Sequence, residues 1–567
     1  MRRFLQWLTV PSRTCTLVCC QLLCAQATLA ADPPELSYLY PAGACPGSTV
    51  TLQAGGTLEN WPVNVLIYGD GIAVGVAEEQ GKLDLVVDPD ADPGVRWLRI
   101  YDQFGASSLR PVMVGALPEV VEQEPNDDPL KAQHLASSVT ANGRLEKEGD
   151  VDCYSVQLRE GQTLVADMLA HRVLASPMDG LLQVCTAAGI VLGQNDDECG
   201  LDPRLVFTAP ADGKYLIRTF AFPAKPDKKI ALSGAESYVY RLTITTDGFV
   251  DHAFPMAVSA SQPTSMQLFG WNLPQGSNSA TVMAPSRSDD FPTESSKTIF
   301  FPEISNSLSF SLHAGSNVAA AALSDPGHPQ SVDVPVTITG RIETLDDRDS
   351  FRFQAQAGHR LAVRVESRSL GYTLDPVLRL ADAKGNVLNE VDDTAESRDA
   401  AFDFEVPSDG EYQITIRDLH GHGGFRYIYR LTVEATEPDF ALTLGSSSYR
   451  LTPGEPLEIP VTVERKHGFS AEIDISATQL PQGVQMEPAR SLADDDPEKP
   501  VQLTLTAAEG GKSGVLRITG SCDDDSSRVR TARYSIPGSR ASHDLAWVTV
   551  LKSAETDEES QQDNESP

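Results

Sequence analysis

Basic residues are scarce in this 567-residue sequence. It has 45 lysines and arginines against 79 aspartates and glutamates, for a formal net charge of −34. A chain this acidic repels polyanions, so we do not expect nucleic acid as a partner. Divalent cations and basic surfaces are better candidates. A second interpretation of the acidic surface is that it keeps an exported protein soluble.

Sustained 3.6-residue hydrophobic periodicity is also lacking. Short alternating runs of Val, Leu, Ile, Thr and Tyr are interrupted instead by Asp-Gly, Pro-Gly and Asn-Asp turns. This pattern is typical of half-buried strands. At about 100–200 residues per domain, the length indicates several domains. We therefore predict an all-β, multidomain chain of tandem antiparallel β-sandwiches, immunoglobulin-like and jelly-roll-like.

Long apolar runs are absent except at the start. Arg2, Arg3 and Arg13 are followed by an apolar stretch from Thr14 to Leu29 that ends in small residues. This predicts a signal peptide over residues 1–31, removed on export, and a secreted, periplasmic or cell-surface protein. Its removal takes away three positive charges and no acid, leaving about −37. An uncleaved membrane anchor is the alternative, but no later stretch could span a bilayer.

No Cys-x-x-Cys motif is present, so neither a zinc ribbon nor a redox motif is indicated. Four of the nine cysteines lie in the signal segment. The five that remain are Cys45, Cys153, Cys185, Cys199 and Cys522. Export permits disulfides. Cys185 and Cys199 flank one predicted turn and could pair, although the sequence leaves the pairing open.

Signatures of catalysis are missing as well. The sequence has neither a Gly-x-Ser-x-Gly elbow nor a His-Glu-x-x-His helix, and the run 510–513 (Gly-Gly-Lys-Ser) lacks the upstream glycine of a phosphate loop. The run 420–424 (His-Gly-His-Gly-Gly) could hold a metal with Asp418 or build an oxyanion hole, but it falls between two predicted strands and is better interpreted as a glycine-rich loop. We predict that the protein is not an enzyme; a divergent secreted hydrolase is the alternative.

An internal repeat is the most informative feature that the sequence does contain. The run 143–146 (Gly-Arg-Leu-Glu) recurs as 340–343 (Gly-Arg-Ile-Glu), 197 residues later. Further matches follow in the same order, at an offset of 197 or 196 and, near the end, of 189. They pair Asp150 with Asp347, Asp152 with Asp349, Gly161 with Gly358, Asp179 with Asp375, Gly189 with Gly385, Tyr215 with Tyr412 and Tyr240 with Tyr429. In each copy the matched stretches are predicted strands separated by turns, as expected for a sandwich.

The repeat divides the chain into modules. We predict a signal peptide at 1–31, an immunoglobulin-like domain at 32–117, the first repeat at 118–246, an immunoglobulin-like domain at 247–331, the second repeat at 332–436, an immunoglobulin-like domain at 437–552 and a disordered acidic tail at 553–567.

The repeat resembles the bacterial pre-peptidase C-terminal domain, a family related to the collagen-binding modules of secreted collagenases. The resemblance is carried by Glu-Pro-Asn-Asp at 124–127, Gly-Asp-Val-Asp-x-Tyr at 149–154 and Asn-Asp-Asp at 195–197. It covers about half of the exported chain. It implies a non-catalytic appendage that binds surfaces or polymers, or aids secretion.

Oxygen donors cluster at the start of the first repeat. Calcium prefers six to eight oxygen ligands, mostly carboxylate, carbonyl and amide. The resemblance implies a calcium site whose ligands map to Glu122, Glu124, Asn126, Asp127, Asp150 and Asp152. The alternative is a turn-forming Asn-Asp and a solvated acidic loop. The second repeat keeps Asp347 and Asp349, but its entry, 328–333, lacks the glutamates, so a metal there is less expected.

These features favour an exported, non-catalytic protein that binds an extracellular polymer or protein through its sandwiches, with structural calcium in the first repeat. Alternatives are a structural component of a cell-surface assembly, built as a semi-rigid rod, and a protease-associated subunit.

Overall fold

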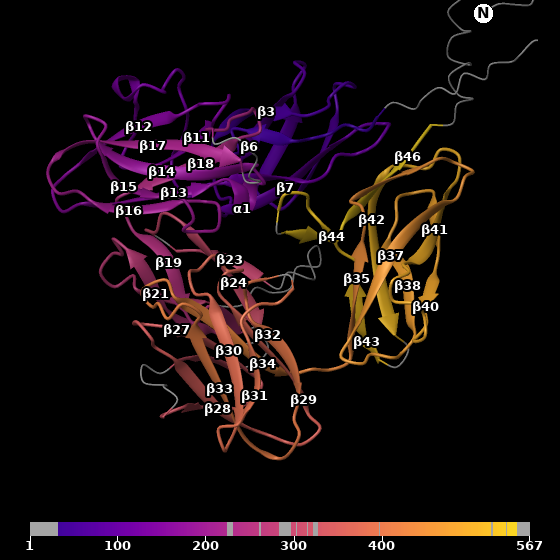
Figure 1. Cartoon of the computed structure of the whole chain (residues 1–567). Coiled ribbons are helices and arrows are strands. Elements are labelled where there is room, and N and C mark those ends of the chain that lie inside the picture. Colours follow the sequence, from indigo (N-terminus) through magenta and orange to yellow (C-terminus); the bar gives the residue numbers. More distant parts are fainter. Residues whose placement is uncertain are drawn as a thin grey trace, which may run out of the picture. The chain divides into compact units, whose positions relative to one another are not determined.

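The computed structural model describes residues 32–223, 231–259, 262–282, 296–301, 303–313, 316–320, 327–395, 397–522, 525–539 and 541–552. The predicted signal peptide and acidic tail lie outside these residues. Within them the chain is all-β, as predicted, and is built from five sandwiches (Figure 1). No helix of this described part is long and apolar enough to cross a membrane.

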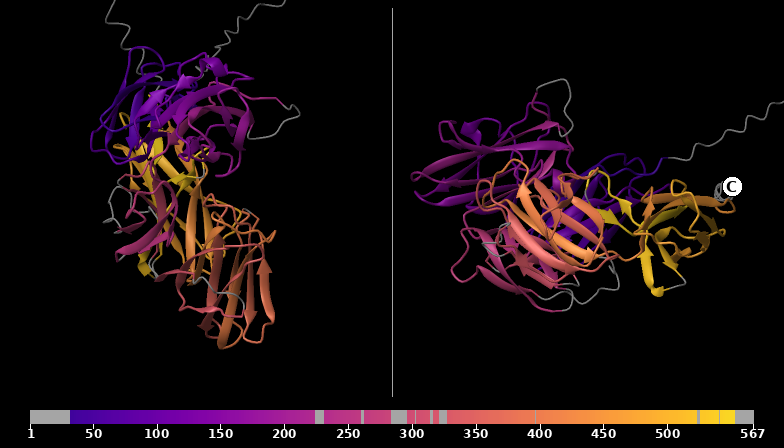
Figure 2. Two further views of the ribbon diagram at one scale, coloured as in Figure 1. Left: turned by 90° about the vertical axis from the view of Figure 1, so that its left-hand side faces the viewer. Right: turned by 60° about the horizontal axis from the view of Figure 1, so that its bottom comes forward.

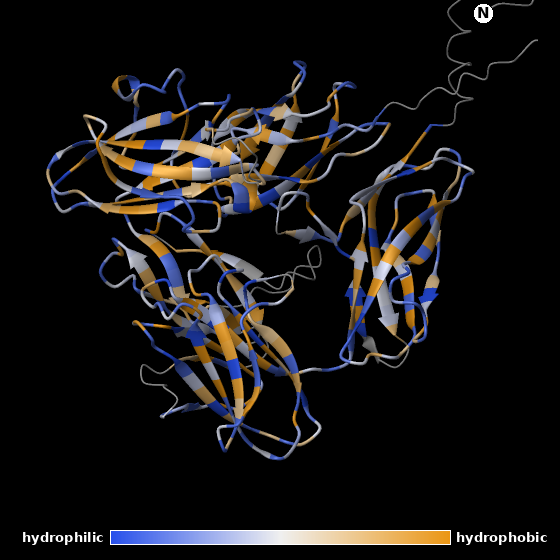
Figure 3. Ribbon diagram, viewed as in Figure 1, coloured by the Kyte–Doolittle hydropathy of each residue, from blue (hydrophilic) through white to orange (hydrophobic). Residues whose placement is uncertain are grey.

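Alternating hydrophobicity explains the strands. In β6 (Lys82–Val87), Leu83, Leu85 and Val87 are buried while the residues between them face outward. Successive side chains of a strand point to opposite faces, so such a segment can cover a core on one side and meet water on the other. The same alternation of apolar and polar residues is visible along many strands in Figure 3.

The N-terminal sandwich pairs the sheet β1-β3-β6-β5 with the sheet β2-β8-β7-β4. Its other strands are β1 (Tyr38–Tyr40), β2 (Gly43–Ala44), β3 (Thr49–Gly55), β4 (Asn64–Tyr68), β5 (Ile72–Val76), β7 (Gly94–Tyr101) and β8 (Arg110–Val114). The core between the two sheets includes Leu52, Leu83 and Leu98.

The first repeat has two five-stranded sheets, β10-β12-β17-β14-β15 and β16-β13-β18-β11-β9. Its elements are β9 (Glu119–Val121), the 3-10 turn η1 (Pro129–Lys131), β10 (Gln133–His134), β11 (Ser138–Arg144), β12 (Asp152–Leu158), β13 (Thr163–Leu169), α1 (His171–Leu174), β14 (Met178–Thr186), β15 (Val191–Asn195), β16 (Arg204–Thr208), β17 (Gly213–Pro223) and β18 (Val239–Thr245).

The second repeat has the same strand order, β26-β28-β33-β30-β31 and β32-β29-β34-β27-β25. Its strands are β25 (Ser316–Ala319), β26 (Gln330–Ser331), β27 (Val336–Arg341), β28 (Asp349–Ala355), β29 (Arg360–Glu366), β30 (Pro376–Asp382), β31 (Val387–Val391), β32 (Ala401–Glu405), β33 (Gly410–Asp418) and β34 (Ile428–Ala435). The internal repeat in the sequence is therefore a duplicated fold.

Most strand pairs of the repeats are antiparallel, as predicted, but the sheets also contain parallel pairs. In the first repeat β9 pairs with β11 and β10 pairs with β12 in parallel, and the second repeat has the equivalent parallel pairs. The reason is that the segment leaving β9 crosses to the other sheet and continues there as β10. The crossing segment, residues 122–132, is called the entry segment below.

The middle sandwich has two three-stranded sheets, β19-β21-β22 and β20-β24-β23. Its strands are β19 (Phe249–Phe254), β20 (Ala257–Ser259), β21 (Thr264–Trp271), β22 (Ser279–Val282), β23 (Ser296–Phe300) and β24 (Ser307–His313).

The C-terminal sandwich, yellow in the two views of Figure 2, pairs the sheet β35-β37-β41-β39 with a sheet containing β36-β46-β42-β38-β40 and β43; β44 and β45 form a small ribbon. Its strands are β35 (Asp439–Leu444), β36 (Ser448–Leu451), β37 (Leu457–Lys466), β38 (Ile473–Gln479), β39 (Val484–Glu487), β40 (Ala489–Ser491), β41 (Val501–Ala507), β42 (Gly514–Cys522), β43 (Asp525–Thr531), β44 (Tyr534–Ser535), β45 (Ser542–His543) and β46 (Ala546–Val550).

The N-terminal and C-terminal sandwiches contact each other directly. Tyr68 and Leu109 belong to the same apolar cluster as the core of the C-terminal sandwich. Buried Arg99 donates to the hydroxyl of Tyr534 at 2.8 Å, and Tyr101 lies 4.4 Å from Trp547 between ring centroids.

The recurring Gly-Arg-Leu-Glu motif has a packing role. A Cβ on Gly143 would lie 2.2 Å from the ring of Tyr240, and a Cβ on Gly340 would lie 2.2 Å from the ring of Tyr429. Each tyrosine is fully buried. The glycine therefore leaves space for a tyrosine ring to lie flat on the neighbouring strand.

Four of the cysteines in the described part of the chain, Cys45, Cys153, Cys185 and Cys199, are free thiols. The possible pairing of Cys185 with Cys199 is therefore not seen. Cys185 is buried on β14, whereas Cys199 lies in the loop between β15 and β16, where its sulfur is 3.7 Å from Arg426.

Candidate functional site

The acidic residues of the first repeat converge where the entry segment passes the start of β12. Each of Glu122, Glu124 and Asp152 offers a carboxylate oxygen, and these three oxygens lie within 4.8 Å of one another. Because β9 pairs with β11 and β10 with β12, the entry segment is fixed at both ends. The two sheets thus hold the glutamates beside Asp152 although they are about thirty residues apart in the sequence.

The carboxylates of Glu122 and Glu124 are oriented by hydrogen bonds. Glu122 accepts from the backbone N–H of Arg144 at 2.9 Å and from the hydroxyl of Tyr40 at 2.8 Å. Glu124 accepts from the backbone N–H of Asn126 at 2.9 Å. None of these bonds supplies a positive side chain to the cluster.

Three of the residues predicted as ligands are buried here. Asn126 and Asp152 are fully buried, and Asp150 is 1% exposed. Both polar side-chain atoms of Asn126, and one carboxylate oxygen each of Asp150 and Asp152, have no hydrogen-bond partner. Leaving such atoms unpaired costs about 1–3 kcal/mol each, and more for charged groups. A bound cation would satisfy these oxygens, so the donor set fits a hard divalent ion.

Asp127 differs from the rest of the set because its side chain is exposed. It contacts Asp150 closely enough to contribute to raising the pKa of that carboxyl. All six predicted residues therefore lie in one region, with Asp127 at its edge.

Burial raises the pKa values of three carboxyls in this cluster, those of Glu122, Asp150 and Asp152. Desolvation is the largest cause in each case, and mutual repulsion adds to it: the pKa of Glu122 rises to about 7, that of Asp150 to about 6, and that of Asp152 well above its ordinary value. The nearby base is Lys147, whose Nζ lies 3.9 Å from Asp150. Several carboxylates held together with so little positive charge repel one another, and a bound cation would relieve this repulsion.

Comparison of the two repeats shows which contacts of the Asp-x-Asp pair are common to both copies and therefore structural. Asp150 accepts from the N–H of Glu146 at 2.6 Å, and Asp347 accepts from the N–H of Glu343 at 2.8 Å. Each copy also bonds its second aspartate to its buried tyrosine, Asp152 to Tyr240 and Asp349 to Tyr429. The Asp-x-Asp pair thus closes a loop and anchors a tyrosine in both copies.

What distinguishes the first repeat is its entry segment. In the second repeat the equivalent segment runs between β25 and β26, which places it earlier than the 328–333 predicted from the sequence; residues 321–326 lie outside the described part. The sequence contains no glutamate from 316 to 331. In contrast to Asp150 and Asp152, neither Asp347 nor Asp349 has a buried oxygen without a hydrogen bond.

Two residues at the site were not anticipated from the sequence. The sequence identifies Tyr240 only as a repeat match. It gives no indication of Tyr40, because this residue belongs to the N-terminal sandwich. The paired recurrence of Gly143 with Tyr240 and of Gly340 with Tyr429 was a usable signal for the former. No local pattern identifies Tyr40.

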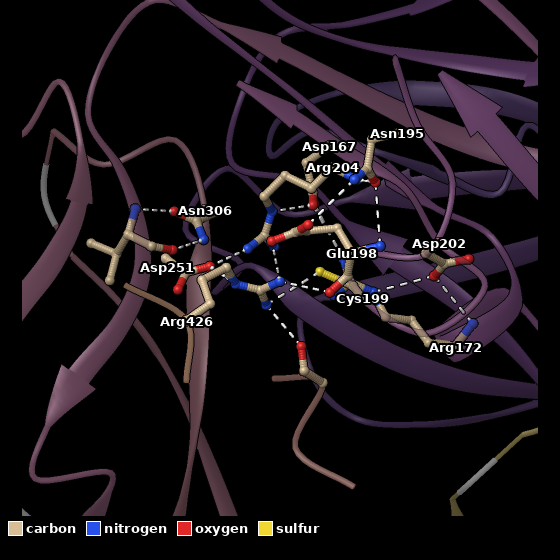
Figure 4. A network of polar contacts seen from close by, with 12 residues as sticks. Asp167, Arg172, Asn195, Glu198, Cys199, Asp202, Arg204, Asp251, Asn306 and Arg426 are labelled. Carbon is tan, nitrogen blue, oxygen red and sulfur yellow. Dashed lines mark hydrogen bonds and ion pairs between the residues drawn. The ribbon is translucent and has the colours of Figure 1, made fainter. Parts of the chain in front are cut away.

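A second polar cluster joins three sandwiches (Figure 4). Asp251 of the middle sandwich lies 2.6 Å from Arg204 of the first repeat and 2.9 Å from Arg426 of the second repeat. Arg204 also pairs with Asp167, and Arg426 with Glu198, each at 2.7 Å. A cavity of about 360 Å³ lies alongside. Each arginine of the polar cluster is paired with a carboxylate, so this cluster is explained by its role in holding the modules together.

The same cluster contains an Asp–His pair. His252 Nδ1 lies 2.8 Å from Asp251, as in a catalytic triad. However, Nε2 of His252 is buried without a hydrogen-bond partner, and the ring packs against Phe269 at 5.0 Å and Phe425 at 4.9 Å between centroids. A triad requires a hydroxyl or thiol at Nε2, so this pair has no nucleophile to activate.

The histidine-rich loop of the second repeat does lie between two strands, β33 and β34, as predicted. Asp418 accepts from the backbone N–H groups of His420 and His422, each at 3.0 Å, and Nδ1 of His422 lies 3.8 Å from the same carboxylate. The loop is thus organised by its backbone.

Both repeats expose apolar side chains at matching positions of an edge strand. Val191 and Leu192 on β15 are 43% and 41% exposed, and Val387 and Leu388 on β31 are 49% and 39% exposed. The preceding glycines, Gly189 and Gly385, are paired in the repeat. β15 and β31 each end a five-stranded sheet, so each presents unpaired backbone groups beside the apolar pair.

Comparison with known proteins supports the assignment of the repeat. Residues 347–418 match the model of the family described as "Bacterial pre-peptidase C-terminal domain". The match lies in the second repeat. No curated protein matches the chain at a significant level.

Among solved structures, the pre-peptidase C-terminal domain of a collagenase from Bacillus anthracis is 14% identical, covers 22% of this chain and 100% of its own, and has a TM-score of 0.16. The protein SGBP-B of the mixed-linkage glucan utilization locus of Bacteroides ovatus, in complex with a mixed-linkage heptasaccharide, is 12% identical, covers 71% of this chain and 74% of its own, and has a TM-score of 0.14. Nothing about function follows from likenesses at this level.

Proposed function

Residues 347–418 form a bacterial pre-peptidase C-terminal domain, and from this premise we propose that the chain is an exported, non-catalytic protein that binds an extracellular polymer through its β-sandwiches. The observation that carries the proposal is the duplication of this module, with the same exposed Val-Leu pair on the same edge strand of each copy. Exposed apolar side chains next to unpaired strand edges are features of recognition surfaces.

We further propose that the first repeat is also a pre-peptidase C-terminal domain and binds calcium through Glu122, Glu124, Asn126, Asp127, Asp150 and Asp152. The support is the convergence of carboxylates from the entry segment and β12 around buried oxygens that have no hydrogen-bond partner. A cation there clips the entry segment to the sandwich and neutralises carboxylates that otherwise repel each other. In this proposal the cation stabilises the fold and takes no part in a reaction.

Binding to polymers tests the main proposal. The exported chain, residues 32–567, is mixed with insoluble collagen, the polymer suggested by the resemblance to collagen-binding modules, and with mixed-linkage glucan as a second extracellular polymer, and the bound fraction is measured by sedimentation. The proposal expects saturable binding to at least one polymer and weaker binding for Leu192→Asp and Leu388→Asp.

A matched control is Val86→Asp, which also changes an apolar residue that is 43% exposed, but on the N-terminal sandwich. Equal binding by all variants contradicts the assignment of the edge strands. Absence of binding to a broader set of extracellular polymers contradicts the proposed function and favours a structural role in a cell-surface assembly.

A further inference from the structure

The cation site of the first repeat is shared with a different module. Tyr40, at the end of β1 in the N-terminal sandwich, donates its hydroxyl to Oε1 of Glu122 at 2.8 Å. Its ring also lies under the guanidinium of Arg144, 4.7 Å from the ring centroid. A residue of the N-terminal sandwich therefore reaches a carboxylate of the candidate site.

The contact belongs to a formed interface. Tyr38, Ala42, Leu174 and Val239 form a buried apolar cluster between the two modules, and Tyr40 and Met113 pack against it. Tyr38 donates its hydroxyl to Glu236 at 2.8 Å. Tyr38 and Tyr40 are two residues apart on one strand and so point to the same side, but only Tyr40 reaches a candidate ligand.

The bond from Tyr40 orients Glu122 and still leaves it able to bind a cation. The backbone N–H of Arg144 occupies one lone pair on Oε2, and the hydroxyl of Tyr40 occupies one on Oε1. An ionised carboxylate has about four acceptor positions, so each oxygen keeps one for a metal. Donors that fix a ligand in this way commonly contribute 10- to 100-fold to metal affinity.

Resting on the calcium site proposed above, we propose that Tyr40 is a positioning residue for that site, so that cation binding in the first repeat and docking of the N-terminal sandwich stabilise each other. The coupling is reciprocal by thermodynamic necessity: if docking increases cation affinity by a given factor, the cation favours docking by the same factor. Binding of a cation at the site then favours the state in which the N-terminal sandwich is docked on the first repeat.

Calorimetric titration with CaCl₂ tests this on the exported chain, residues 32–567, after treatment with chelator. Tyr40→Phe removes only the hydroxyl, and Tyr38→Phe removes the matched hydroxyl from the same interface. We expect about 10-fold weaker calcium binding for Tyr40→Phe and a change of less than about two-fold for Tyr38→Phe. Equal affinities for both variants, or tighter binding by Tyr40→Phe, overturn the inference.

Hydrogen exchange supplies a readout of docking. We expect the amides of β1 to exchange about 10-fold more slowly with calcium than with chelator in the wild type, and at equal rates in Asp152→Asn. Rates of β1 that do not respond to calcium in the wild type contradict the coupling. Calcium binding by the wild type that is unaffected by Tyr40→Phe overturns the coupling alone, whereas no binding by the wild type overturns the calcium site itself and the coupling with it.

Discussion

Replacement of Asp251 by asparagine tests how the two repeats are held together. Asp251 is fully buried and lies within 3 Å of Arg204 and of Arg426, one from each repeat. Breaking a buried ion pair by removing one partner costs about 3–5 kcal/mol, because the other charge stays buried. Arg204 and Arg426 each keep a second carboxylate, so we expect the lower end, about 3 kcal/mol.

An exposed pair with the same geometry is the control. Arg490 lies 2.7 Å from Asp474, but both side chains are 39% or more exposed, so Asp474→Asn should cost less than about 1 kcal/mol. Urea unfolding at pH 7, followed by fluorescence and by hydrogen exchange in both repeats, measures the two losses. The expected result is a large loss for Asp251→Asn, with less cooperative unfolding of the two repeats. Equal, small losses for the two variants would refute the argument that burial sets the strength of this network.

The pH dependence of the same network has a defined sign. Burial alone raises the pKa of Asp251, but the hydrogen bond with His252 and the charges of Arg426 and Arg204 outweigh it and lower the pKa to about 2. An acid whose pKa is lowered by folding stabilises the folded state above its unfolded value of about 3.9. This contribution should be lost as the pH falls from about 4 towards 2, and the wild type should converge on Asp251→Asn in that range.

Two further predictions concern single residues. Burial lowers the pKa of His543 to about 4, so the unfolded chain binds a proton more readily between about pH 4 and 6.5. The contribution of His543 to stability should therefore fall by about 2 kcal/mol between pH 8 and pH 5. Urea unfolding at both pH values should show this loss in the wild type relative to His543→Gln, and the same change with pH in both proteins would contradict this assignment. Gly143→Ala should displace Tyr240 from Asp152, cost about 1–3 kcal/mol of stability and weaken calcium binding, whereas Gly340→Ala should cost as much stability without affecting calcium binding. Thermal unfolding and calcium titration of both variants check this. An unchanged melting temperature for either variant would show that the tyrosine ring is not constrained by its glycine.

The repeat allowed much of the fold to be predicted. The segment from Asp152 to Leu158 was expected as a strand and is β12, because its alternation and the flanking turns are local properties. The parallel pairing of β9 with β11 and of β10 with β12 was not anticipated. Strand direction in these sheets depends on how the entry segment crosses from one sheet to the other. The place of the entry segment in the second repeat was misjudged for the same reason.

The candidate site divides in the same way. Glu122, Glu124 and Asp152 were expected to converge because they belong to one module and the resemblance to the pre-peptidase C-terminal domain implies that they share a calcium site. Tyr40 could not be predicted, since it is 82 residues from Glu122 and its position follows from the packing of two modules. The pairing of Asp251 with Arg204 and Arg426 likewise depends on contacts between modules, which no pattern within one strand encodes.

The most direct test of the calcium-stabilised binding module is thermal unfolding of the exported chain with calcium and with chelator, beside Asp152→Asn. A ligand that binds only the folded state at 100 times its dissociation constant adds about 2.7 kcal/mol. The account predicts that calcium raises the melting temperature of the transition that includes the first repeat, and that this rise is absent in Asp152→Asn. The same melting temperature with calcium and with chelator in the wild type would contradict the account and leave the acidic cluster without its cation.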